Sequence, residues 1–159
     1  MQGDPDVLKL LNEQLTSELT AINQYFLHSK MQDNWGFTEL AAHTRAESFE
    51  EMQHAEAITD RILLLDGLPN YQRLFSLRVG QTLREQFEAD LAIEYEVVAR
   101  LKPGIVMCRE KQDAVSANLF ETILGDEEGH IDYLETQLEL MDKLGDALYA
   151  AQCVARPPK

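Results

Sequence analysis

The chain has 159 residues, of which 45% are apolar and 26% are charged, which is typical of one folded domain rather than a disordered segment. Its 28 acidic residues outnumber its 14 basic residues, and the formal charge is −14. Such a surface repels nucleic-acid phosphates and anionic membranes but attracts multivalent cations, so neither nucleic acid nor membrane is expected as a partner.

Long stretches without Pro or Gly predict helices, because strands usually span only about 5–6 residues. In chain order the expected helices cover residues 5–34, 37–65, 82–111, 113–144 and 146–153. The first two are separated by the short break Asn34-Trp35-Gly36, whereas residues 70–81 form a crossover without clear periodicity. The expected fold class is therefore all-α, an antiparallel four-helix bundle with a long crossover and a short fifth C-terminal helix.

Capping residues support these boundaries. Asp4 precedes Pro5, a residue that is favoured in the first helical turn. The sequence Thr82-Leu83-Arg84-Glu85 is a capping box, and Asp113 is a suitable N-cap for the fourth helix. Pro103 interrupts this pattern because an interior proline removes a backbone hydrogen bond. We expect a kink or a break near Lys102.

Each long helix places a glutamate in the middle of its apolar face. In the first helix, Leu11, Leu15 and Ile22 recur at helical spacing, and Glu18 lies in the same row. The equivalent acids of the other three helices are Glu51, Glu94 and Glu127. Two of the four are followed three residues later by a histidine on the same helix face, in the pairs Glu51–His54 and Glu127–His130.

The spacing of these residues repeats along the chain. Glu51 follows Glu18 by 33 residues, and Glu127 follows Glu94 by the same interval. The second Glu-x-x-His motif lies 76 residues after the first. This repetition predicts two helical hairpins that are related by an approximate two-fold axis.

Two interpretations of the buried acids compete. A single Glu-x-x-His is weak evidence in a chain this rich in glutamate, and an isolated glutamate on such a face is usually salt-bridged. Four glutamates at one level would repel one another, however, and burying one uncompensated carboxylate costs several kcal/mol. Two divalent metal ions would cancel the four charges. The ligand set favours iron, then manganese, over zinc, as in ferritin-like di-iron bundles.

The cysteines and the N-terminus predict an intracellular protein. Cys108 and Cys153 form no CxxC motif, and two thiols are too few for a disulfide scaffold. The longest apolar run, residues 147–151, is too short to span a membrane, and no secretory signal is recognisable at the start.

The sequence resembles the bacterioferritin family over essentially the whole chain. The resemblance is clearest in three segments: residues 18–28 (ELTAINQYFLH), 34–36 (NWG) and 126–132 (DEEGHID). The resemblance implies a single ferritin-like domain over residues 1–159 with a ferroxidase centre. In that centre Glu18 and His54 hold one iron, Glu94 and His130 hold the other, and Glu51 and Glu127 bridge the two ions. It also implies oxidation of Fe(II) by dioxygen or peroxide and mineral deposition inside a 24-subunit shell in the bacterial cytoplasm. A reductase ferredoxin would release the iron.

Four further residues are functional candidates. The resemblance implies that Met52 ligates haem b together with its counterpart across a dimer two-fold axis, although a lone methionine is usually core filler. Tyr25 lies on the same face as Glu18 and is an auxiliary candidate for redox chemistry. Glu47 and Glu50 are candidate inner-surface iron ligands, but some family members have a histidine where this chain has Ala46.

Two other protein classes would share part of this pattern. A rubrerythrin-like peroxidase also has paired carboxylate–histidine helices, but it normally carries a CxxC iron domain that this chain lacks. A bundle that carries haem or docks a partner, with an idle metal site, would be non-enzymatic. The sequence leaves three points open. They are the preferred oxidant, whether the metal pair is a permanent cofactor, and whether the chain assembles with copies of itself or with a second chain type.

Overall fold

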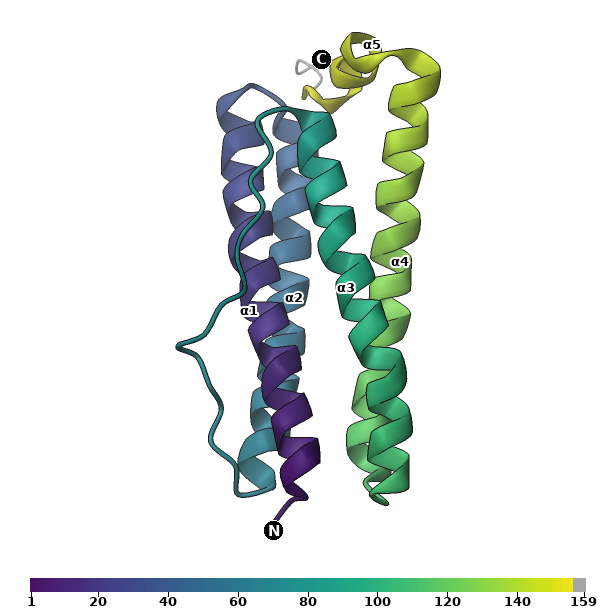
Figure 1. Ribbon diagram of the computed structural model, residues 1–159. Helices are drawn as coiled ribbons and strands as arrows, with labels where there is room; N and C mark the ends of the chain where they lie inside the picture. Colours follow the sequence, from purple (N-terminus) through teal and green to yellow (C-terminus); the bar gives the residue numbers. More distant parts are fainter. Residues whose placement is uncertain (156–159) are drawn as a thin grey trace.

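Four long helices make up most of the protein, and the computed structural model describes residues 1–155 (Figure 1). The elements are α1 (Pro5–Asn34), α2 (Thr38–Leu64), α3 (Leu83–Glu110), α4 (Ala114–Leu144) and α5 (Asp146–Ala150), followed by a 3-10 turn (Ala151–Cys153). Between residues 1 and 155 there is no β-strand. No helix in that range is long and apolar enough to cross a membrane.

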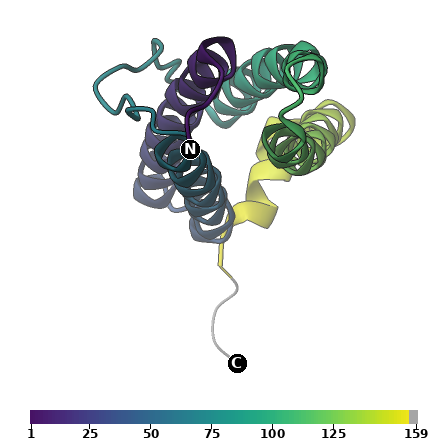
Figure 2. The same cartoon turned by 90° about the horizontal axis from the view of Figure 1, so that it is seen from below.

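Short connections pair the helices into two antiparallel hairpins, α1 with α2 and α3 with α4. Gly36 adopts φ +92° in the first turn, a conformation that favours glycine. The crossover between α2 and α3 returns along the outside of α1, so α2 and α3 run in the same direction (Figures 1 and 2). This long return brings the two hairpins together in one four-helix bundle.

The helix starts follow the capping residues of the sequence. The Asp4 side chain accepts hydrogen bonds from the backbone N–H groups of Asp6 and Val7, and Pro5 is the first helical residue. Thr82 accepts from the N–H of Glu85. Asp113 accepts from the N–H of Ser116. Three of the four long helices therefore begin where a side chain satisfies a free backbone donor.

The chain does not break near Lys102, because α3 continues without interruption through Pro103 to Glu110, whereas a kink there stays a prediction. Packing outweighs the lost hydrogen bond on this part of the helix. Leu101, Gly104 and Cys108 are all buried, and the backbone of Gly104 lies close to the Leu10 side chain of α1. The interior of the bundle thus stabilises a helix that the local sequence alone would end.

The apolar core consists of two clusters with polar residues between them. The larger cluster includes Leu11, Leu15, Ile58, Val97 and Phe120. The smaller one joins Phe87, Leu134 and Met141 to Tyr149 of α5 and to Cys153. Cys108 and Cys153 are both buried free thiols, and the functional candidates lie in the polar part of the interior.

Packing does not require glycine at position 125 of α4, because a Cβ atom added there would meet no heavy atom within 4 Å. We predict that Gly125→Ala stabilises the protein by up to about 1 kcal/mol, since alanine costs less entropy in a helix. The thermal midpoint of the iron-free protein should rise. Gly104→Ala is the matched control and should give no increase, because its Cβ would lie 2.9 Å from Leu10 Cδ2. A lower midpoint for Gly125→Ala would contradict this explanation.

Candidate metal centre

The four mid-helix glutamates meet at one level inside the bundle. Glu18, Glu51, Glu94 and Glu127 are each at most 1% exposed, although they come from four different helices. Together with His54 and His130 they form two overlapping groups whose ligand atoms lie within 4.8 Å of one another. One group is Glu18, Glu51, His54 and Glu127; the other is Glu51, Glu94, Glu127 and His130. Glu51 and Glu127 belong to both, which is the arrangement that two bridged ions require.

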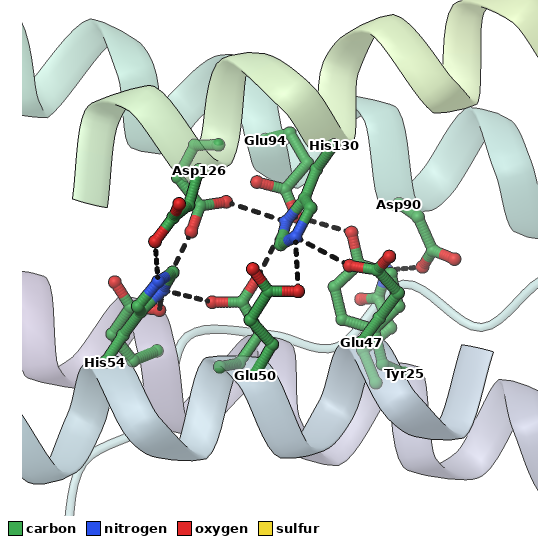
Figure 3. Close-up of polar contacts among 12 residues, drawn as sticks. Tyr25, Glu47, Glu50, His54, Asp90, Glu94, Asp126 and His130 are labelled. Carbon is green, nitrogen blue, oxygen red and sulfur yellow. Dashed lines mark hydrogen bonds and ion pairs between the residues drawn. The ribbon is translucent and has the colours of Figure 1, made fainter. Parts of the chain in front are cut away.

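The two histidines face the centre from opposite hairpins, α2 and α4 (Figure 3). Each imidazole directs Nδ1 toward three carboxylates at closely similar distances. For His54 Nδ1 they are Glu127 at 3.0 Å, Glu51 at 3.2 Å and Glu18 at 3.7 Å. For His130 Nδ1 they are Glu51 at 3.2 Å, Glu127 at 3.3 Å and Glu94 at 3.7 Å. The centre is therefore nearly symmetric, in agreement with the sequence repeat.

The protein alone does not satisfy these carboxylates. Both oxygens of Glu127, Glu51 Oε1 and Glu94 Oε2 are buried and lack a well-aligned hydrogen-bond donor among the described residues. Buried oxygens of this kind normally have partners, and their absence favours a bound cation. Four carboxylates and two imidazoles, with two of the carboxylates shared, fit a pair of divalent iron or manganese ions.

The crowding of negative charge shifts the ionisation of the whole group. Burial raises the pKa of Glu18 and Glu94, and repulsion from Glu51 and Glu127 raises it further. Burial alone would lower the pKa of His54 and His130, but the surrounding carboxylates raise it well above its usual value. Without metal, the imidazolium groups thus supply part of the positive charge that the site needs.

The outer nitrogen of each imidazole contacts carboxylates at the edge of the site. His54 Nε2 lies 2.9 Å from Asp126 Oδ2, and His130 Nε2 lies 2.6 Å from Glu47 and 3.2 Å from Glu50. Such contacts orient metal-binding histidines and fix the tautomer in which Nδ1 faces the metal. Sequence analysis missed Asp126, although it lies 76 residues after Glu50 and follows the same repeat.

Glu47 is held between two histidines. It lies 3.1 Å from His43 Nε2 in addition to its contact with His130. Burial opposes ionisation, but these two partners lower the pKa of Glu47 to about 2. Glu47, Glu50 and His130 form a further group that could hold a cation beside the main centre. The structure thus brings both predicted inner-surface residues next to one histidine of the centre.

Tyr25 connects the centre to a buried polar network. Its hydroxyl donates a short hydrogen bond to Glu94 Oε1, and burial followed by the charge of Glu94 raises its pKa. Nearby, Asp90 Oδ1 accepts hydrogen bonds from Gln24 Nε2 at 2.8 Å and His28 Nδ1 at 2.9 Å. The backbone N–H of Gly80 donates to His28 Nε2 at 3.0 Å, which requires the hydrogen of this imidazole to be on Nδ1.

Met52 lies away from the centre, on the outside of α2, and 52% of it is exposed. Phe49, one turn earlier, and Phe26 of α1 are exposed on the same face, where the Arg45 guanidinium lies 5.5 Å and 5.8 Å from their ring centroids. The thioether is therefore accessible, and it does not fill the core.

Comparisons with known proteins identify the family of this chain. The Ferritin-like domain family matches residues 8–144. Bacterioferritin BfrA of Mycobacterium tuberculosis is 86% identical over 158 residues, which cover 99% of each chain, and the bacterioferritin of Streptomyces coelicolor is 65% identical over 97% of this chain and 92% of that protein. The chain belongs to the bacterioferritin family.

Two solved structures of similar proteins have nearly the same fold as this chain. A mycobacterial bacterioferritin gives a TM-score of 0.98 at 90% identity, covering 100% of this chain and 99% of that chain. The structure of M. tuberculosis BfrA gives 0.98 at 86% identity and covers 100% of both chains. The all-helical, ferritin-like fold expected from the sequence is confirmed, and membership of the family supports a role in iron storage.

Metal binding at this centre should compete with protons. The pKa of His54 and of His130 is raised in the metal-free site, and an imidazole must be neutral to bind a metal. We predict that the affinity for Co(II), followed by its visible absorption, increases with pH between 6 and 8 and that binding releases protons into a weakly buffered solution. Glu88→Gln, an exposed position on α3, should behave like the wild type, and a pH-independent affinity would refute the expectation.

Proposed function

We propose that the protein is a ferroxidase. It oxidises Fe(II) at the centre of four glutamates and two histidines described above and stores the product as ferric mineral. The observation that carries the proposal is the sharing of Glu51 and Glu127 by two four-residue ligand groups. Shared carboxylates hold two Fe(II) ions side by side, and each ion gives up one electron. The two electrons reduce one dioxygen to hydrogen peroxide or one hydrogen peroxide to two waters, with uptake of two protons in either case.

The side chains of this site support the reaction by charge and position. Four carboxylates neutralise two Fe(II) ions and stabilise the additional charge of Fe(III). The outer contacts of His54 and His130 hold the imidazole rings in place. Tyr25 positions Glu94 through its hydrogen bond and is the nearest candidate for supplying an additional electron. Glu47 and Glu50 offer a next binding position for iron that leaves the centre.

The proposal extends to the assembly. We infer that the protein forms a homo-oligomeric shell of 24 subunits in the cytoplasm, that the mineral fills its interior, and that a reductase ferredoxin returns electrons for iron release. These features rest on membership of the bacterioferritin family. An acidic chain with a formal charge of −14 is suited to attracting iron ions toward such a shell.

Met52 supports a haem site between two copies of the chain. Its exposed thioether and the exposed Phe49 and Phe26 beside it provide an apolar surface with a soft ligand, which fits the face of a haem. We propose that Met52 and the same residue of a second subunit would hold the haem iron through their sulfur atoms. When bound, the haem would supply a one-electron carrier.

Removing one ligand of the centre should slow iron oxidation. We predict that Glu94→Ala lowers the initial rate of Fe(III) absorbance growth after aerobic addition of Fe(II) by at least about tenfold, since even outer residues of metal sites cost 10–100-fold. Glu18→Ala should have a similar effect, because it removes the equivalent ligand of the other ion. Glu88→Ala on α3 is the control and should keep the wild-type rate. Equal rates in all four proteins would leave only a passive bundle.

The haem assignment has a separate test. We predict that Met52→Leu removes the Soret band while the native mass of the shell is unchanged, because leucine keeps the apolar volume but lacks the sulfur ligand. Glu88→Ala on α3 is a suitable control, as it leaves the face of Met52 and Phe49 unchanged. Haem content equal to that of the wild type in Met52→Leu would exclude this residue as the ligand.

A further inference from the structure

A cavity of about 310 Å³ lies on the side of the bundle formed by α1, α3 and the second half of the crossover. Its walls include Ser17, Thr20, Phe75, Ser76, Arg78 and Arg100. The crossover is anchored there by backbone N–H groups, since that of Phe75 donates to Thr20 Oγ1 and that of Arg78 donates to Gln24 Oε1. The cavity therefore has fixed walls on all three sides.

Arg100 is the feature of this cavity that lacks an explanation. Its Nη1 is buried and makes no hydrogen bond, and its guanidinium has no carboxylate within 4.0 Å among residues 1–155. The guanidinium lies 5.1 Å from the centroid of the Phe75 ring, which holds it in place. A buried, charged donor without a partner is costly, so an arginine fixed in this way favours a bound acceptor.

Arg100 has no ion-pair partner beside this cavity among residues 1–155. Arg73 pairs with Glu13 at 2.9 Å, and Arg78 forms a close ion pair with Glu96 at the cavity wall. Glu13, Glu96 and Glu18 are near enough for their charges to act on Arg100, but none of them forms an ion pair with it. In a chain with 28 acidic residues an unpaired, half-buried arginine is unexpected, and it favours a small anionic ligand.

Hydroxyl groups complete the donor set. Thr20 Oγ1 is already used, because it donates to the carbonyl of Thr16 and accepts from Phe75. Ser17 and Ser76 border the cavity and have no such internal role among the described residues. A guanidinium fork with nearby hydroxyl donors is the usual means of binding a phosphate or carboxylate group.

We propose that this cavity binds a small oxyanion, with Arg100 as the principal donor and Ser17 and Ser76 as secondary donors. The site is distinct from the metal centre because none of the six residues of that centre lines the cavity. The proposal does not depend on the ferroxidase activity, and it can be tested without iron.

The test is calorimetric titration of the assembled, iron-free protein with inorganic phosphate in a low-salt buffer. We expect about one phosphate per chain, and we expect Arg100→Gln to weaken its binding by at least about tenfold, because a hydrogen bond to a charged group is lost. Arg100→Lys should weaken binding less, since it retains the charge but loses the fork. Arg109→Gln is the matched control on the same helix, where the native side chain is exposed and pairs with Glu121.

Further arms distinguish the possible occupants. If acetate competes with phosphate, the site accepts oxyanions generally. If phosphate binds and acetate does not compete, the site prefers a tetrahedral anion. Both results support the proposal. No binding to the wild type, or equal binding to Arg100→Gln, overturns it. Loss of the native oligomer mass in Arg100→Gln also overturns it, because the guanidinium would then be held by a carboxylate of a neighbouring subunit.

Discussion

The structure depends on the burial of four like charges at one level. Carboxylates that are shielded from water repel one another strongly, and within residues 1–155 no Lys or Arg forms an ion pair with the glutamates of this centre. In the metal-free state the histidines relieve part of the repulsion by retaining protons. A pair of cations does so more completely. The bundle thus holds a site that is unfavourable for the protein alone, and under the proposed function this unfavourable energy becomes affinity for iron.

Helix geometry makes this arrangement possible. Side chains three residues apart project from one face, so a single helix can provide both the bridging glutamate and a histidine. Two such hairpins face each other, and each provides half of the ligands. Because the helices are long and packed along their length by an apolar core, the ligands are held by rigid elements on both sides of the centre.

Much of the fold and the centre could be predicted from the sequence, because both depend on periodicity. The caps at Asp4, Thr82 and Asp113 are local signals, and the repeated Glu-x-x-His reports a helix face directly. The helix does not break near Lys102, because contacts between α3 and α1 outweigh the local effect of Pro103. Asp126 and the network around Asp90 were missed, since their roles depend on neighbours from other helices. Arg100 also required the structure, because a sequence does not reveal which arginine lacks a partner.

The hydrogen bond from Gly80 to His28 ties the crossover to the interior of the bundle. If this end of the crossover detached, His28 Nε2 would lose its hydrogen-bond donor, and Asp90 would lose a donor of defined orientation. Detachment therefore carries the energetic cost of disturbing the core. Although much of the connection is exposed to solvent, its final residues belong to the same cooperative unit as the helices, and they should resist hydrogen exchange as the bundle does.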